Sequence, residues 1–165
     1  ATKSSNELIA HTYSKLYNLN TIGLRFFTVY GPWGRPDMAY YKFADSLVQN
    51  KSIDIYNNGN MIRDFTYIDD IIEGITRVIQ INNNSPFEVY NIGNDNPINL
   101  MDFIKIMENY FKKKFKINFL PHQLGDVKST HASIENFSNH YNYKPKINLD
   151  EGIKNFVTWY KSYNK

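Results

Sequence analysis

Segments with the character of strands and of helices alternate along the whole chain. β-Branched and aromatic residues over 21–27 predict a strand, and apolar residues three and four positions apart over 69–80 predict an amphipathic helix. Further strands are expected near 53–56, 65–68, 88–92 and 117–120, and further helices near 1–18, 40–48, 99–111, 133–140 and 148–163. Such alternation predicts an α/β fold, because helices connect neighbouring parallel strands.

The ends and faces of two helices can be predicted from individual residues. Asp69 and Asp70 are expected to cap the helix that runs to Gln80, and Asn99 is expected to cap the helix that runs to Phe111. A loop is expected over 82–86. The apolar positions predict buried faces made of Ile71, Ile72, Ile75, Val78 and Ile79 in the first helix and of Phe103, Ile104, Met107 and Phe111 in the second.

The composition excludes several classes of protein. The 165 residues include no cysteine, so disulfides, thiolate metal sites and cysteine nucleophiles are excluded. No apolar run approaches the roughly 18 residues of a membrane span. The net charge is +3, and the short lysine run at 112–116 is too mild for a nucleic-acid surface and suits the end of a helix. The four histidines show no metal-ligand spacing, so no metal site is expected.

The stretch from Arg25 to Ala39 says most about function. It reads Arg-Phe-Phe-Thr-Val-Tyr-Gly-Pro-Trp-Gly-Arg-Pro-Asp-Met-Ala, a strand that runs into a loop with two glycines and two prolines over 31–36. With Arg63-Asp64-Phe65-Thr66-Tyr67-Ile68-Asp69-Asp70 it resembles the nucleotide-sugar epimerases of the extended short-chain dehydrogenase/reductase family. Among these it is most similar to the enzymes that act on UDP-glucuronate at C4, and the resemblance covers nearly the whole chain.

The resemblance implies a fold and a division of the chain. The chain would be the C-terminal, substrate-binding part of an extended Rossmann-type nucleotide-sugar epimerase, truncated before the Gly-rich cofactor loop. Residues 1–35 would be the last part of the Rossmann domain. Residues 36–165 would be mostly substrate-binding domain, with some segments returning to the Rossmann sheet. The first helix lacks a regular beginning at Ala1-Thr2-Lys3, which agrees with a chain cut at its front.

NAD is the cofactor that the resemblance implies, although the chain contains no Gly-x-Gly-x-x-Gly fingerprint. The family's catalytic Tyr-x-x-x-Lys would place its lysine at Lys3 and its tyrosine two residues before Ala1. Lys3 would then bind the nicotinamide ribose and lower the pKa of that tyrosine, since an ammonium stabilises a phenolate. Phe27 would also contact the cofactor. Taken alone, Lys3 is a solvated surface residue.

Three residues near the Gly/Pro loop are implied to bind the substrate. The hydroxyl of Thr28 would bond the sugar carboxylate; the alternative is a strand-end threonine bonded to its own backbone. Arg35 stands in a rigid loop, where a planar guanidinium suits a phosphate or carboxylate, and the alternative is an exposed loop arginine. Met38 belongs to the same motif and is implied to contact the substrate.

Three further residues are implied to bind the nucleotide. Tyr56 would pack against uracil, although a core aromatic is the plainer interpretation, and Arg63 would grip the diphosphate. An ion pair between Arg63 and its neighbour Asp64 is the alternative, which adjacent residues rarely make well. Asp126, in Gly125-Asp126-Val127, would take the ribose hydroxyls. Many relatives carry arginine where this chain has Gln123, so Arg35 and Arg63 are the expected phosphate ligands.

The expected function is that of the C-terminal part of an NAD-dependent epimerase that interconverts UDP-glucuronate and UDP-galacturonate through a 4-keto intermediate. The fragment alone is expected to be inactive, and the complete enzyme is expected to be cytoplasmic and to serve surface polysaccharide synthesis. One alternative is a nucleotide-sugar binding module without catalysis; another is a related dehydratase, decarboxylase or different epimerase. The expected partners are the UDP-sugar and either a second copy or the missing half, which would cover the apolar face of the first helix. No nucleic acid or membrane partner is expected.

Overall fold

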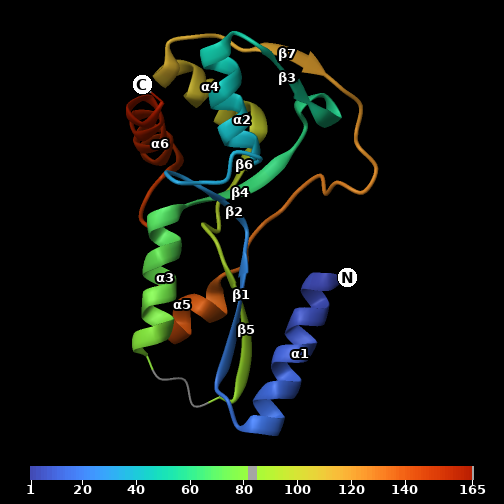
Figure 1. Cartoon of the computed structure of the whole chain (residues 1–165), viewed down its shortest axis with the longest axis vertical. Coiled ribbons are helices and arrows are strands. Elements are labelled where there is room, and N and C mark those ends of the chain that lie inside the picture. The colour runs from blue at the N-terminus through green and yellow to red at the C-terminus, as the bar shows by residue number, and fades with distance from the viewer. Residues whose placement is uncertain (82–84, 165) are drawn as a thin grey trace.

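The computed structural model describes residues 1–81 and 85–164, and it packs them as two regions around separate hydrophobic clusters (Figure 1). The helices are α1 (Thr2–Tyr17), α2 (Ala39–Gln49), η1 (Tyr56–Gly59, a 3-10 helix), α3 (Ile68–Gln80), α4 (Leu100–Phe111), α5 (Glu135–Tyr141) and α6 (Leu149–Tyr163). The strands are β1 (Thr21–Phe26), β2 (Thr28–Tyr30), β3 (Ser52–Ile55), β4 (Ile62–Tyr67), β5 (Phe87–Ile92), β6 (Pro97–Asn99) and β7 (Lys116–Phe119). The predicted alternation of strands and helices is therefore confirmed.

The strand predicted over 21–27 ends one residue early and is followed by a second strand that was not predicted. β1 pairs in parallel with β5, whereas β2 pairs in parallel with β4, which is also antiparallel to β6. The chain changes sheets at Phe27, so one apolar run in the sequence serves both regions. β3 and β7 form a third small parallel sheet among the described residues.

The lower region in Figure 1 is built on β1 and β5, with α1 on one side and α3 and α5 on the other. Ser14 is the one buried residue of α1 in the described chain, and it donates to the carbonyl of Pro86. The apolar side chains of α1 point away from this contact: Leu8 and Leu16 are 69% and 68% exposed. The expected exposure of this face is therefore confirmed.

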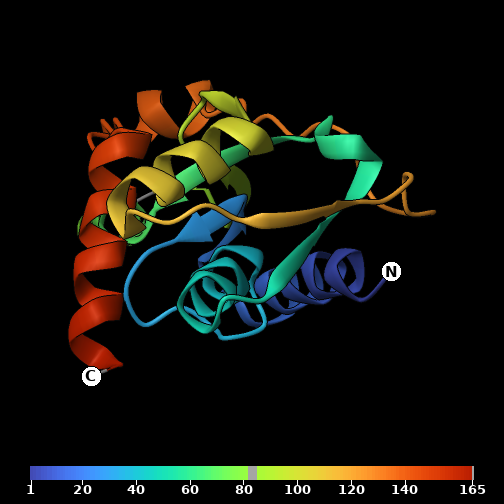
Figure 2. The ribbon, with the colours of Figure 1, turned by 90° about the horizontal axis from the view of Figure 1, so that it is seen from above.

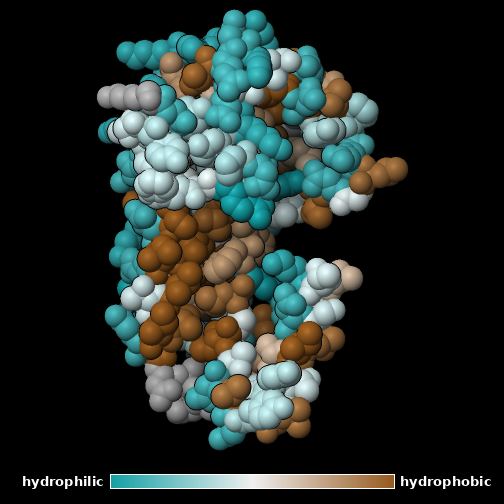
Figure 3. Space-filling view, viewed as in Figure 1, coloured by the Kyte–Doolittle hydropathy of each residue, from teal (hydrophilic) through white to brown (hydrophobic). Residues whose placement is uncertain are grey.

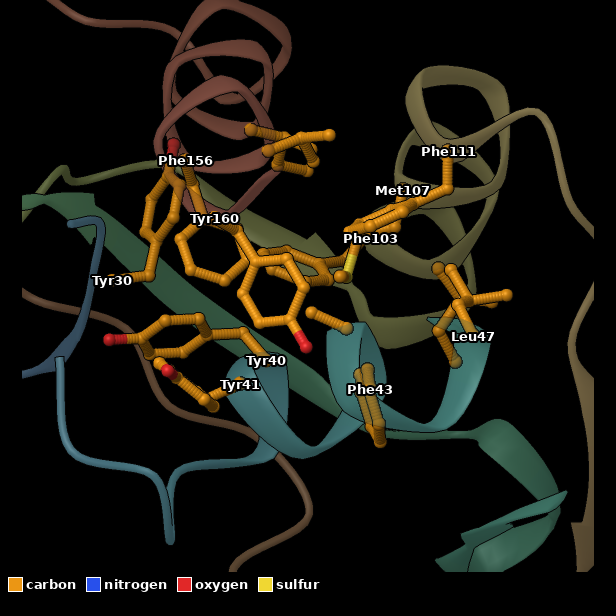
Figure 4. Close-up of a cluster of buried hydrophobic side chains, with 14 of the residues drawn as sticks. Tyr30, Tyr40, Tyr41, Phe43, Leu47, Phe103, Met107, Phe111, Phe156 and Tyr160 are labelled. Atoms are coloured by element: carbon orange, nitrogen blue, oxygen red, sulfur yellow. The ribbon is translucent and has the colours of Figure 1, made fainter. Parts of the chain in front are cut away.

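An aromatic cluster fills the upper region, between α2, α4 and α6 (Figure 4). The ring of Tyr30 lies edge-on to those of Tyr40 and Phe103, and Phe103 stacks on Phe65 with 4.4 Å between ring centroids. Desolvation in this cluster raises the pKa of Tyr30 well above its usual value. The burial predicted for Phe103, Ile104, Met107 and Phe111 is confirmed.

The predicted caps were right at one helix and wrong at another. The side chain of Asn99 accepts from the backbone N–H of Met101 at 2.8 Å and caps α4, as expected. Tyr67, by contrast, precedes α3 without a side-chain cap. Asp70 is buried and accepts from the backbone N–H groups of Lys146 and Ile147 at 3.0 and 3.1 Å. Its carboxylate holds a distant segment, and so it does not cap its own helix.

Other boundaries shift by a few residues. The segment predicted over 65–68 is the end of β4, which begins at Ile62, and the helix predicted over 133–140 is α5. In α3 the predicted buried face was too broad, because Ile72 and Ile79 are 53% and 78% exposed. Of the loop predicted over 82–86, residues 82–84 lie outside the described residues. No helix in the described ranges combines the length and hydropathy that a bilayer crossing needs.

Candidate functional site

A cavity of about 340 Å³ opens between β2, α2, β4 and α4. Four of the six residues predicted to bind substrate line it: Thr28, Tyr56, Arg63 and Asp126. They come from four separate parts of the sequence and meet because β2 and β4 are neighbours and the segment after β7 returns beside β4. The structure thus brings together in one place residues that the sequence could only suggest one by one.

Arg63 holds the loop that carries Asp126. Its Nη2 lies 3.0 Å from Asp126 Oδ1, and its Nη1 donates to the carbonyls of Ile62 and Lys128 at 2.9 and 3.3 Å. The Arg63 side chain is only 18% exposed, so its charge acts in a partly desolvated setting. These bonds leave donor capacity at Nε and Nη2 of the guanidinium, which can face an anion in the cavity.

Asp64 points to the other side of β4 and does not pair with Arg63. It is fully buried, and its two carboxylate oxygens accept from the backbone N–H groups of Asn94 and Ala132, each at 3.0 Å. Its own N–H donates to the Thr130 hydroxyl at 3.3 Å. Asp64 therefore ties β4 to two distant segments and fixes the strand from which Arg63 projects.

Tyr56 stands at the rim of the cavity, 38% exposed, as the first residue of η1. Asn57 and Asn58 follow it with φ of 51° and 50°, left-handed values that asparagine tolerates better than most residues. Gly59 completes this turn at φ 82°, where a Cβ would come within 2.9 Å of Met101 Sδ. The turn thereby holds an aromatic ring half in solvent at the mouth of the cavity.

The structure places Arg35 and Met38 outside this lining. The guanidinium of Arg35 is 75% exposed and pairs at 3.0 Å with Asp37, which does line the cavity. Met38 precedes α2 and packs against the upper aromatic cluster. The roles of both residues toward a ligand stay predictions.

A larger cavity, about 1020 Å³, lies between α1 and β1. Figure 3 shows the hollow between α1 and the body of the molecule, next to a hydrophobic surface over α3. Lys3 and Phe27, the residues predicted to bind cofactor, both line this cavity. Thr28 lines both cavities, so it stands where the two meet.

An ion pair in the larger cavity escaped the sequence analysis. Arg25 Nε and Nη2 each lie 2.7 Å from a carboxylate oxygen of Glu7, a two-point contact between β1 and α1. The hydrogen bond from Arg25 lowers the pKa of the Glu7 carboxyl, and the same bond raises the pKa of Arg25. Neither residue stands in a motif that predicts the other, because the pair forms only once α1 packs on the sheet.

Three charged side chains that were not predicted to bind a ligand complete the smaller cavity. They are Asp37, Lys42 and Asp54. Within the described residues, no three His, Asp or Glu side chains gather as a metal site. With one partly buried arginine, several carboxylates, a hydroxyl and an aromatic rim, the cavity can hold a molecule that joins an anionic group to hydroxyls and a flat ring.

Comparisons with known proteins identify relatives of this chain. "Protein CapI" of Staphylococcus aureus is 47% identical over the full length of this chain, which covers 54% of that protein. "UDP-glucuronate 4-epimerase 1" of Arabidopsis thaliana is 44% identical over 99% of the chain, which covers 42% of it. The chain thus spans about half the length of the curated relatives it matches.

A solved structure shares the same fold. The UDP-glucuronic acid 4-epimerase of Bacillus cereus, in complex with UDP-glucuronic acid and NAD, superposes with a TM-score of 0.92 at 35% identity. The match covers 98% of this chain and 52% of the other. The model of the NAD dependent epimerase/dehydratase family matches residues 1–93, more than half of the chain. The chain belongs to the NAD dependent epimerase/dehydratase family.

Proposed function

We propose that this chain forms the UDP-sugar-binding half of an NAD-dependent 4-epimerase that interconverts UDP-glucuronate and UDP-galacturonate. The observation that carries the proposal is the meeting of Thr28, Tyr56, Arg63 and Asp126 around one cavity. The relatives named UDP-glucuronate 4-epimerase, and the similar structure that holds UDP-glucuronic acid and NAD, support the choice of substrate and cofactor.

In this proposal the nucleotide is held at the outer end of the cavity. Tyr56 offers an aromatic face to the uracil, and stacking of this kind contributes roughly 1–3 kcal/mol. Arg63 donates to the diphosphate through the N–H groups that Asp126 leaves free. Asp126 accepts from the ribose hydroxyls, so the ion pair between the two side chains pre-positions both ligands.

The sugar then lies at Thr28, where the smaller cavity meets the larger one. The larger cavity is wide enough for a dinucleotide fragment, and Lys3 and Phe27 would hold NAD there. Bound NAD would supply the acceptor and donor of the C4 hydride. The hydroxyl of Thr28 orients the sugar carboxylate, and Lys3 places a positive charge where a phenolate base upstream would be stabilised.

The remaining features of the proposal concern the whole protein. Residues 1–35 would complete a Rossmann domain, and 36–165 would form mostly the substrate domain. Alone, the 165 residues would bind UDP-sugars without turning them over, because the tyrosine base is not among them. The exposed face of α1 would be covered by the other half or by a second copy, and the enzyme would act in the cytoplasm in surface polysaccharide synthesis.

Calorimetric titration of the 165-residue chain with UDP and with UDP-glucuronate tests the binding half of the proposal. Arg63→Ala should lower the affinity for both ligands by about tenfold to a hundredfold, since a charge-assisted hydrogen bond to phosphate contributes about 1.5–3 kcal/mol. Lys105→Ala is the matched control: it also removes a cation paired with an aspartate, at 3.1 Å, but it lies on α4 outside the lining. Equal affinities in the two variants would count against the site.

Product analysis tests the reaction. The whole protein, given NAD and UDP-glucuronate, should yield UDP-galacturonate, identified by proton NMR of the anomeric signals. A UDP-pentose product would show a decarboxylase instead. Nucleotide-sugar binding with no turnover in the whole protein would identify a binding module.

A further inference from the structure

Few side chains attach α1 to the sheet. Its one buried residue in the described chain is Ser14, near the C-terminal end, which donates to the carbonyl of Pro86. His11, one turn earlier, places its ring edge-on to that of Phe87, with 5.0 Å between ring centroids. In the view from above, the N-terminal end of α1 extends beyond α2 at one side of the molecule (Figure 2). The first two turns of α1 therefore need a separate anchor.

The pair of Glu7 and Arg25 is that anchor. Nε and Nη2 of Arg25 donate to the two carboxylate oxygens of Glu7, each at 2.7 Å. Two parallel bonds between planar groups fix their relative orientation, which a single bond would not do. The Arg25 and Glu7 side chains are 57% and 31% exposed, so the pair adds little to overall stability and acts chiefly on geometry.

Lys3 is placed by this anchor. It precedes Glu7 by four positions, so the two side chains lie one turn apart on the same face of α1. Lys3, Glu7 and Arg25 are the charged side chains that line the larger cavity within the described residues. In the same part of the chain no hydrogen bond or ion pair holds the Lys3 ammonium. Where that ammonium stands thus depends on how α1 is turned.

Arg25 also decides which partner Glu7 takes. A carboxylate four positions away from a lysine can pair with it along a helix. Here both oxygens of Glu7 bond Arg25, and among the described residues Lys3 has no carboxylate partner. Without Arg25, the Glu7 carboxylate would be free to turn to Lys3 and neutralise the positive charge that the proposed function uses.

We propose that Glu7 and Arg25 are positioning residues for Lys3, and that their pair both fixes the rotation of α1 and keeps Glu7 away from the Lys3 ammonium. The inference rests on the proposed function, in which Lys3 binds the cofactor ribose and supports the tyrosine base upstream. Neither Glu7 nor Arg25 has to touch cofactor or substrate for this, because both act through Lys3.

The test measures kcat of the whole protein, with NAD and UDP-glucuronate, from about pH 6 to about pH 9. Arg25→Gln should lower kcat near neutral pH by about threefold to tenfold and move the acidic limb of the profile upward by roughly 0.5–1 unit. The reason is that a phenol which loses a neighbouring positive charge deprotonates at higher pH. The KM for UDP-glucuronate should stay within about twofold. The bond from Arg25 lowers the pKa of the Glu7 carboxyl, so Glu7 itself does not titrate in this range.

A double variant separates positioning from simple loss of an ion pair. Glu7→Gln removes the anchor but leaves no carboxylate to compete for Lys3, so its loss of kcat should be smaller, about twofold. Adding Glu7→Gln to Arg25→Gln should therefore restore the activity and the pH profile of Glu7→Gln alone. If the double variant is as impaired as Arg25→Gln, or if the acidic limb does not move in Arg25→Gln, the inference is overturned.

Glu73→Gln is the matched control. Glu73 is 31% exposed, as Glu7 is, and it accepts from Nε and Nη2 of Arg77 at 3.1 and 2.7 Å. It lies on α3 outside both cavities, so Glu73→Gln should leave kcat and its pH profile unchanged. Lys3→Met tests the proposed function by itself. If Lys3→Met is inactive while Arg25→Gln equals the wild type, only the inference fails; if Lys3→Met is fully active, both fail.

Amide hydrogen exchange of the 165-residue chain follows the anchor without cofactor or catalysis. The N–H groups of residues 5–10 should exchange severalfold faster in Glu7→Gln and in Arg25→Gln than in the wild type, whereas Glu73→Gln should leave them unchanged. Wild-type exchange in both α1 variants would show that the pair does not hold α1, and it would overturn the inference.

Discussion

Replacing Asp64 by alanine should strongly destabilise the chain, although the residue touches no predicted ligand. The carboxylate is fully buried, and it is the acceptor for the backbone N–H groups of Asn94 and Ala132. Each buried donor left without a partner costs about 1–3 kcal/mol, so Asp64→Ala should lower the free energy of unfolding by about 2–6 kcal/mol. Against the roughly 5–15 kcal/mol that holds a domain folded, this is a large share.

Urea unfolding followed by far-ultraviolet circular dichroism measures the effect. With a slope of about 1–3 kcal/mol per molar urea, the midpoint should fall by at least about 0.7 M at unchanged slope. Asp64→Asn keeps one acceptor but turns an amide toward the second N–H, so it should lie between wild type and Asp64→Ala. Asp102→Ala, which removes an exposed aspartate paired with Lys105, should cost no more than about 1 kcal/mol. If Asp64→Ala and Asp102→Ala cost the same, the assigned role of Asp64 is wrong.

Three further outcomes are expected. Gly34→Ala should lower the melting temperature by several degrees, because its Cβ would lie 1.5 Å from the Tyr40 hydroxyl oxygen and 2.7 Å from the ring carbon that bears it. Adding Tyr40→Phe removes the hydroxyl but leaves that ring carbon, so calorimetry should show recovery of only part of the loss, whereas Tyr40→Phe alone should not lower the melting temperature as far as Gly34→Ala does; equal losses for the two single variants would contradict the clash. Lys146 and Arg77 lower the pKa of the Glu73 carboxyl below its usual 4.5, so the unfolded chain binds the proton more readily: this stabilisation is complete above about pH 4.5 and is lost as the pH falls through the folded-state pKa. The melting temperature should therefore fall less between about pH 7 and about pH 3.5 in Glu73→Gln than in the wild type. Equal decreases in the two proteins would contradict the assignment. Leu16→Lys, on the exposed face of α1, should change the free energy of unfolding by less than about 0.5 kcal/mol but reduce self-association in analytical ultracentrifugation, and unchanged association would mean that this face is not the contact.

The fold class and most element boundaries could be predicted from sequence because periodicity reports directly on which face of an element is buried. The faces of α4 were predicted well, since Phe103 and Met107 recur at helical spacing with polar residues between them. The break between β1 and β2 could not be seen, because Phe27 continues an apolar run and only the pairing partners differ. The apolar face of α3 was predicted too broadly because Ile72 and Ile79 match the apolar pattern, yet both are more than half exposed among the described residues.

The candidate site could likewise be predicted only where its residues belong to a contiguous motif. Thr28 and Arg63 stand in contiguous motifs, and both lie on the cavity, as the motifs indicated. Asp70 looked like a cap because acidic residues favour helix N-termini, but its partners are 76 and 77 positions away, a distance at which sequence pattern carries no information. The pair of Glu7 with Arg25 was invisible for the same reason.

The placement of α6 has a consequence for the order in which the molecule can form. Phe156 and Tyr160 complete the same aromatic cluster that Tyr30 and Tyr40 begin, so the two sides of that cluster are separated by more than 100 residues of chain. During synthesis Tyr30 and Tyr40 stay exposed until α6 has emerged from the ribosome and can pack against them. Contacts of such long sequence separation slow folding and leave apolar surface open to aggregation. Apolar surface that a chaperone could bind is therefore most exposed in the interval before α6 has been synthesised.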